Sequence, residues 1–363
     1  MKISFVGDVM PGGVLSYQQD YIDENLKNHL SSSDYLIGTL EVPIGTGLAY
    51  DEEKMQGRCN IVYAQENDFR RVRELGFKAV SLANNHVMDL GPEGLANTIK
   101  LLKESGIQYF GAGMNAEEAS QPAILNIGDK TMAIYGYCMF GVPYLGLVHL
   151  AEENTPGVNP LIIEKVLKDI KKAKSRYDYV AIMPHWGREY RYEPLDICIQ
   201  MAHQMVEAGA DFIIGSHPHQ IQPIVTRRKS LIAYSLGNFL FPDFYMCPPR
   251  PIWYPSPEKD LSEIKEVVGY PFPISEPIKQ IWKNSSRIGC ILELTIKDSK
   301  YTYNAQYVEL SKQNILKFHN LDKKIRKNLS RSGFATNHAW YGKCINTLYS
   351  IKVALFKHIF PSK

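Results

Sequence analysis

Two histidines flank a single proline in the stretch "GSHPHQIQPI", which covers residues 215–224. His217 and His219 are separated by Pro218, a combination that suits neither a helix nor a hydrophobic core. In an extended segment residues two apart point to the same face, so both imidazoles are expected to reach one site while the proline stiffens the turn. Such a pair of imidazoles is typical of a transition-metal site.

Further polar side chains stand where predicted strands end. They occur in the segments "FVGDVM", "GTLEVP", "SLANNHVMDLG" and "IMPHWGREY", and they are Asp8, Glu41, Asn85, His86 and His185. In open α/β proteins ligands bind outside the carboxyl ends of the strands, where the loops converge. We therefore expect side chains from five separate segments to meet at one rim.

The expected donor set contains carboxylate, carboxamide and imidazole groups and lacks sulfur. It favours one or two divalent ions of Mn, Fe or Zn at a catalytic site, over a thiolate zinc site or an all-oxygen calcium site. Each residue alone has an ordinary structural explanation: Asp8 could cap a helix, Asn85 could belong to a turn, and Trp186 beside His185 could be core. Their coincidence at five strand ends favours the metal site.

The elements that must position these residues alternate along the chain. Short runs rich in Val, Ile, Phe and Tyr alternate with helix-period segments at 19–30, 66–75, 92–105, 159–175 and 195–208. This alternation indicates an α/β fold. Hairpins are expected around Gly128-Asp129 and within 222–241, so two sheets with helices outside fit better than one parallel sheet.

Two segments depart from this alternation. Nine prolines between residues 242 and 284 predict an insertion or long loop over the sheet edge, without regular elements. After a further hairpin, residues 311–363 are expected to form a basic, aromatic helical extension. The domain that carries the site would then cover residues 1–310.

Composition limits the class of protein. The chain has 363 residues, of which 45% are hydrophobic and 22% charged, and its net charge of +3 gives no reason to expect a nucleic-acid partner. Six scattered cysteines without a CxxC motif indicate reduced structural thiols.

No signal segment or membrane-spanning run is recognisable, so a cytoplasmic protein without an integral membrane segment is expected. A basic helix expected at 343–360 leaves peripheral membrane contact open, although packing on its own domain is favoured.

The strand-end segments also carry a resemblance. The chain resembles the CapA family of capsule and poly-gamma-glutamate biosynthesis proteins in the blocks "GDVM", "LEVPIG", "LANNHVMDLGPEGLANTIKLLKESGI", "GAGMNAEEA", "PHWGREY", "EAGADFIIGSHPHQIQP" and "IAYSLGNFLF". That family is similar to the calcineurin-like metallophosphoesterases. The resemblance therefore implies a four-layer α/β/β/α sandwich with a dinuclear metal centre over residues 1–310.

The resemblance also implies a ligand set for each of two metals. The first metal would be bound by Asp8 and His219. The second would be bound by Asn85, His185 and His217. These roles follow from matching positions in the blocks, and the residues alone leave the division between the two metals open.

Five other positions complete or weaken the implied site. Glu41 stands where the phosphoesterases have a bridging aspartate, and His86 where they have the general acid. Those enzymes usually carry a histidine where this chain has Met10, so the resemblance implies a first site that is weak, exchangeable or empty. An arginine-containing "FRA" motif of the family is replaced by "IVYAQEN". Arg58 is the candidate substitute for substrate binding, together with Glu189.

The function implied is a metal-dependent hydrolase in capsule, poly-gamma-glutamate or related surface-polymer biosynthesis. It would act on a phosphoester or amide bond, with an anionic polymer or a phosphoester as substrate and other capsule-synthesis proteins as partners. The alternative is a non-catalytic assembly or carrier-binding component, because Met10 stands at a ligand position. Many members of the family begin with a membrane anchor, which is not expected here.

Overall fold

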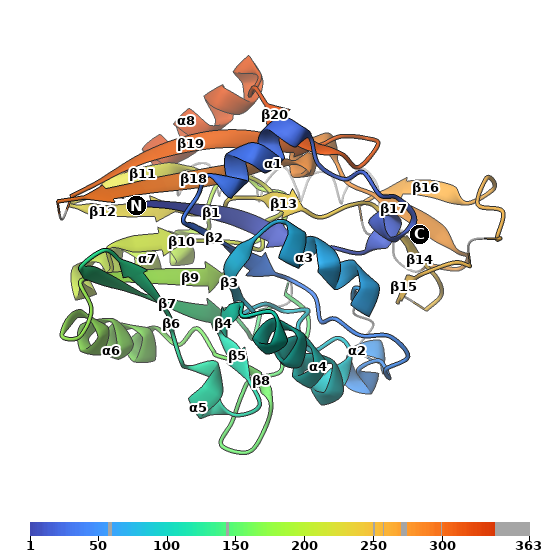
Figure 1. The fold of residues 1–363 in the computed structure, drawn as a ribbon, viewed down its shortest axis with the longest axis horizontal. Helices are drawn as coiled ribbons and strands as arrows, with labels where there is room; N and C mark the ends of the chain where they lie inside the picture. Colours follow the sequence, from blue (N-terminus) through green and yellow to red (C-terminus); the bar gives the residue numbers. More distant parts are fainter. Residues whose placement is uncertain are drawn as a thin grey trace, which may run out of the picture.

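The computed structural model describes residues 1–363 except 57–59, 143–144, 250, 257, 270–273, 299 and 338–363. Two β-sheets pack face to face, and helices cover the outer face of each (Figure 1). This is the four-layer α/β/β/α sandwich that the resemblance implied. The prediction of two sheets with helices outside is confirmed.

The first sheet runs in the order β20-β19-β18-β1-β2-β3-β4, and β13 also pairs with β1. Its strands are β1 (Lys2–Val9), β2 (Tyr35–Leu40), β3 (Phe77–Ser81), β4 (Gln108–Phe110), β13 (Asn238–Leu240), β18 (Ile288–Lys297), β19 (Lys300–Leu310) and β20 (Leu316–His319). Strands β1 to β4 are parallel to one another. Their carboxyl ends therefore lie at the same edge of the sheet.

The second sheet runs in the order β11-β12-β10-β9-β7-β6. Its strands are β6 (Ala123–Ile127), β7 (Lys130–Cys138), β9 (Tyr179–His185), β10 (Phe212–Ile214), β11 (Ile224–Arg227) and β12 (Ser230–Ala233). The antiparallel pairs β6–β7 and β11–β12 confirm two of the predicted hairpins. Between them, β7, β9, β10 and β12 run parallel.

The core is divided by the alternation of side chains along the strands. In β2, Ile37 belongs to the apolar layer between the sheets, whereas Leu36 and Leu40 belong to the layer beneath the helices. The first sheet is covered by α1 (Glu24–Ser31), α3 (Arg70–Glu74) and α4 (Gly91–Glu104), and the second by α6 (Ile163–Lys174) and α7 (Asp196–Ala208). Each of these helices buries apolar residues against its sheet, which stabilises both sheets from outside.

Shorter elements complete the described chain. They are α2 (Glu52–Gln56), α5 (Ala116–Ala119), the 3₁₀ turns η1 (Gly13–Tyr17), η2 (Glu66–Phe69) and η3 (Asn284–Arg287), and the paired strands β5 (Ala112–Gly113) and β8 (Gly157–Val158). The predicted helix at 66–75 is therefore split between η2 and α3. None of the described helices is long and apolar enough to cross a bilayer.

The proline-rich segment differs from its prediction. It forms a separate four-stranded sheet, at the right of Figure 1, from β14 (Phe244–Met246), β15 (Ile252–Trp253), β16 (Lys265–Val268) and β17 (Ile278–Ile281). The prediction of no regular elements is wrong because the described prolines of the segment lie outside these strands of two to four residues, so they remove no hydrogen bond from the strand ladders.

The C-terminal part also differs from its prediction. Residues 311–363 were expected to be helical, but β20 extends the first sheet by pairing with β19. A helix follows, α8 (Lys323–Asn337). The basic helix expected at 343–360 lies outside the described residues.

Candidate metal centre

The first sheet supplies four of the predicted site residues. Asp8 lies in β1, Glu41 directly follows β2, and Asn85 and His86 lie in the turn after β3. Because β1, β2 and β3 are adjacent and parallel, these positions meet at the carboxyl edge of the sheet. The predicted convergence is confirmed for this sheet.

A bulge in β1 helps to place Asp8. The register of β1 against β2 shifts between Phe5 and Asp8. Gly7 lies in this bulge, and a Cβ there would lie only 1.7 Å from the carbonyl oxygen of Gly237. Glycine is required at this close approach, which lets Asp8 stand opposite Asn238 of β13.

The second sheet supplies three histidines. His185 is the last residue of β9, and His217 and His219 follow β10. Their backbone is not extended as predicted, because φ is 94° at His217 and 48° at His219. Such values are strained in residues other than glycine. The His217 N–H donates to Asp8 Oδ2 at 3.2 Å, so the strained turn is held against β1.

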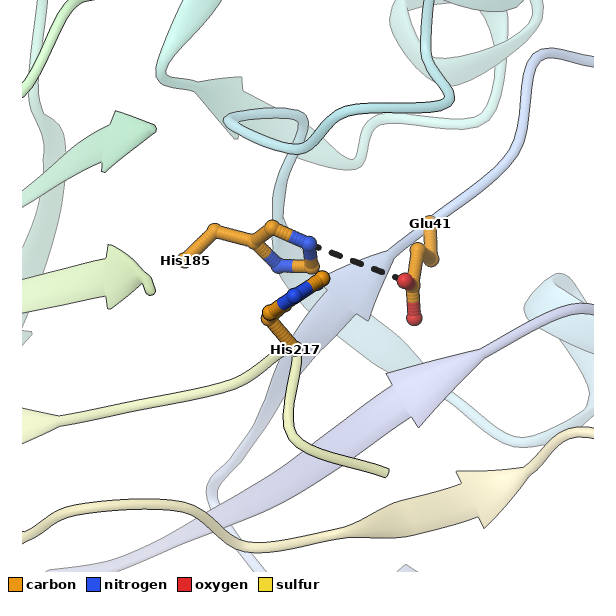
Figure 2. Close-up of side chains that lie close together, drawn as sticks. All are labelled: Glu41, His185 and His217. Carbon is orange, nitrogen blue, oxygen red and sulfur yellow. Dashed lines mark ion pairs between the residues drawn. The ribbon is translucent and has the colours of Figure 1, made fainter. Parts of the chain in front are cut away.

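The donor atoms form two groups that share Glu41. One group contains Glu41, His185 and His217, and the other Asp8, Glu41 and His219; within each group the atoms lie within 4.8 Å of one another. Figure 2 shows Glu41 and His185 facing each other, with His185 Nε2 3.6 Å from Glu41 Oε1. His219 Nε2 lies 3.4 Å from the same oxygen. Glu41 therefore belongs to both groups of donor atoms.

Asn85 lies beside the first of these groups. Its Oδ1 is 2.8 Å from His185 Nε2. The side chain is nearly buried, with 8% exposed. This position agrees with the ligand set that the resemblance implied for Asn85 and His185.

The cluster is buried, and many of its polar atoms have no partner. Asp8, Glu41, His185, His217 and His219 are each at most 1% exposed. Within the part of the chain that the structure describes, Asp8 Oδ1, both Glu41 oxygens and both His217 ring nitrogens make no hydrogen bond. An unsatisfied buried polar group costs about 1–3 kcal/mol. A divalent cation would satisfy these atoms together, so the residues fit a metal ion.

Burial dominates the electrostatics of the cluster. It raises the pKa of Asp8 to about 7 and the pKa of Glu41 well above its ordinary value. It lowers the pKa of His219 to about 3 and the pKa values of His185 and His217 well below the ordinary range. The imidazoles are therefore neutral, which is the form that binds metal. The carboxyl groups gain from a nearby cation, which favours their ionised forms.

Neighbouring residues orient two of the imidazoles. Asn238 Nδ2 donates to the carbonyl of Ser286, so the Oδ1 of the same amide accepts from His219 Nδ1 at 2.7 Å. His185 Nδ1 lies 2.9 Å from Ser216 Oγ. Hydrogen bonds of this kind fix the ring orientation of metal-binding histidines and leave Nε2 for the ion.

His86 is held by a buried carboxylate. Its Nδ1 donates to Asp89 Oδ2 at 2.7 Å, and Lys54 Nζ lies 2.5 Å from Asp89 Oδ1. Burial works to raise the pKa of Asp89, but Lys54 and His86 together outweigh it and lower this pKa. Asp89 is therefore ionised and only accepts hydrogen bonds. The Nε2 of His86 is then the nitrogen available for proton transfer.

The remaining predicted positions have different outcomes. Arg58 lies outside the described residues, so its role stays a prediction. Glu189 lies near the cluster, since its charge contributes to the raised pKa of Glu41. Burial raises the pKa of Glu189 itself to about 7, with Lys283 acting in the opposite direction.

Met10 belongs to the apolar layer beneath the helices. It is fully buried, and its Sδ accepts the Gly12 N–H at 3.2 Å. Asp8, two residues earlier, does lie in the cluster. The chain therefore has a buried thioether in the apolar core at the position where the resemblance implied a histidine ligand.

Sequence reasoning missed the residues that orient the candidate ligands and His86. These are Ser216, Asn238, Asp89 and Lys54 of α2. The three-residue spacing between His86 and Asp89 is a signal that could have indicated their pairing. Lys54 gives no such signal, because it comes from a separate short helix.

Comparison with known proteins supports the resemblance. The model of the family described as "Bacterial capsule synthesis protein PGA_cap" matches residues 2–243. "Capsule biosynthesis protein CapA" of Bacillus anthracis is 34% identical over 252 residues, covering 66% of this chain and 60% of that protein. "PGA biosynthesis protein CapA" of Bacillus subtilis (strain 168) is 32% identical over 248 residues, covering 66% of this chain and 63% of that protein. The matches thus span less than two thirds of either relative.

The family match covers most of the chain and all the predicted metal ligands. The chain therefore belongs to the PGA_cap family of bacterial capsule synthesis proteins.

Proposed function

We propose that this protein is a metal-dependent hydrolase of the metallophosphoesterase type that acts in capsule, poly-gamma-glutamate or related surface-polymer biosynthesis. Membership of the PGA_cap family supports the biosynthetic setting. The observation that carries the hydrolase proposal is the buried cluster around Glu41, in which several polar atoms have no hydrogen-bond partner among the described residues. A cluster with only a structural role would have its buried polar atoms paired.

One or two divalent ions of Mn, Fe or Zn suit these donors. The residues that would hold them divide into Asn85, His185 and His217 for one ion, Asp8 and His219 for the other, and Glu41 for both. When bound, such ions lower the pKa of a coordinated water toward ~7 and polarise a substrate oxygen.

The chain itself supplies the proton for the leaving group. His86 is partly exposed, and Asp89 holds its Nδ1, so the ring presents Nε2. In its protonated form His86 can give the Nε2 proton to the departing oxygen or nitrogen. Positioned proton transfer of this kind contributes roughly 10²–10⁴-fold to the rate.

The substrate is proposed to be an anionic polymer or a phosphoester, cleaved at a phosphoester or amide bond, with other capsule-synthesis proteins as partners. A cytoplasmic location also stays a prediction from the sequence.

One observation favours a second candidate function, that of a non-catalytic assembly or carrier-binding component. Met10, buried in the apolar core, stands where the phosphoesterases have a metal-binding histidine.

Hydrolysis of bis(4-nitrophenyl) phosphate and of a gamma-glutamyl peptide tests the proposal. The Mn²⁺-loaded protein should cleave at least one of them, and a chelator should abolish the reaction. His86→Gln should retain its metal but lose roughly 10²-fold or more in rate. A protein that binds metal but cleaves neither substrate would favour the assembly component.

A further inference from the structure

The end of the proline-rich segment is fixed by buried polar contacts. The Trp282 N–H donates to Asp243 Oδ1 at 3.0 Å, and its indole N–H donates to the Pro242 carbonyl at 3.0 Å. Asp243 in turn pairs with the Arg287 guanidinium at 2.6 and 2.7 Å. Trp282, Asp243 and Arg287 are all buried. The segment therefore returns to the main domain at a defined position.

That position borders the metal centre. The Trp282 ring centroid is 4.9 Å from that of His219 and 6.4 Å from that of Tyr190. The Tyr190 ring is 6.5 Å from His219, and the Tyr190 N–H donates to the Pro218 carbonyl at 2.8 Å. Two aromatic rings from distant parts of the sequence therefore form a wall beside the same histidine.

Lys283 adds a positive charge to this wall. Its Nζ lies 4.4 Å from the centre of the Tyr190 ring, and its side chain is exposed. Among the described residues it forms no ion pair, and it acts on Glu189 only over a longer distance. An ammonium held over an aromatic face keeps its charge available to a ligand while its position is restricted.

We propose that Lys283 binds an anionic group, a carboxylate or a phosphate, on the non-reacting part of the substrate. This inference rests on the proposed function for the placement of the reacting bond at the metal centre. A lysine is suited to this role because its ammonium is a point charge without a demanding geometry. An anionic polymer would place one charged repeat at Lys283 while the neighbouring repeat lies at the metals.

Calorimetric binding of two probes to the Mn²⁺-loaded protein tests the proposal. The probes are tri-gamma-glutamate, which offers carboxylates, and inorganic phosphate. Lys283→Met should weaken at least one of them about tenfold, as expected for a hydrogen bond between charged groups, and Lys283→Arg should restore most of the affinity. Lys100→Met is the matched control, because Lys100 is 68% exposed on α4, and it should bind both probes as the wild type does.

The pattern of losses identifies the anion. A loss for tri-gamma-glutamate alone assigns Lys283 to a carboxylate, and a loss for phosphate alone assigns it to a phosphate. Equal binding by wild type and Lys283→Met, or binding of neither probe by the wild type, would overturn the proposal. If Lys283→Met weakens binding but the wild type cleaves no substrate, the hydrolase proposal fails while the anion site stands.

Discussion

Asp8 and Asp243 are both buried aspartates, each at most 1% exposed, but their surroundings differ in charge. Asp243 meets Arg287 in two contacts and also accepts the N–H of Trp282. Asp8 lies beside a second carboxyl group, that of Glu41, and its Oδ1 has no partner among the described residues. Asp243, which stabilises the fold, therefore has the positive charge of Arg287 beside it. Asp8, where we propose that a metal binds, has another carboxyl group beside it.

The largest effect on stability is expected at the paired aspartate. Asp243→Ala leaves the Arg287 charge buried without its partner, which should cost about 3–5 kcal/mol in the free energy of unfolding. Urea unfolding of the metal-free protein measures the loss. The exposed pair Lys279–Glu266, at 2.8 Å, is the control, and Glu266→Gln should cost at most about 1 kcal/mol.

Asp8, which lies beside the Glu41 carboxyl group, should behave differently in the same experiment. Asp8→Asn removes a carboxyl group whose pKa burial has raised to about 7. The metal-free variant should therefore be as stable as the wild type or more stable. A loss for Asp8→Asn as large as that for Asp243→Ala would show that both clusters are structural.

A second effect is expected in the pH dependence of metal affinity. The raised pKa of Asp8, about 7 in the metal-free protein, means that a proton must leave when the ion binds below that pH. Affinity should therefore fall as the pH is lowered from 8 through ~7, by about tenfold per pH unit for each proton displaced. Calorimetric titrations between pH ~5.5 and ~8 measure the slope, which Asp8→Asn should reduce. A constant affinity across this range would contradict the assignment.

The smallest effect is expected at Met10. If the thioether weakens one site, the wild type should bind one ion tightly and a second only at higher concentration. Met10→His should strengthen the second site, by about tenfold at most, since the imidazole must leave a packed apolar position to reach the ion. Met10→Leu keeps the apolar contacts and is the control. Two equally tight ions in the wild type would contradict the weakened site.

The convergence of the candidate metal ligands could be predicted from the sequence. Asp8, Glu41 and His185 lie at or just after the carboxyl ends of parallel strands, and topology brings such ends together. The positive φ at His217 could not be predicted. It accompanies a hydrogen bond to Asp8, which lies 209 residues away in the chain.

The strands of the proline-rich segment could not be predicted for a similar reason. Runs as short as β14 give no periodic signal, and β14 pairs with β17, which lies more than thirty residues later in the chain. Asn238 could not be predicted for the same reason. Its side chain reaches His219 only because β13 pairs with β1 beside Asp8. Local composition therefore indicated the candidate ligands better than the residues that support them.

The most direct test of the metal centre is a titration of Mn²⁺ or Zn²⁺ into chelator-treated protein. The wild type should bind at least one ion, and His185→Ala and His217→Ala should each lose most of it, because each removes one of few ligands. Both metal-free variants should unfold like the metal-free wild type, since the Asp243–Arg287 pair is unchanged. Full metal binding by both variants, or no binding by the wild type, would contradict the account.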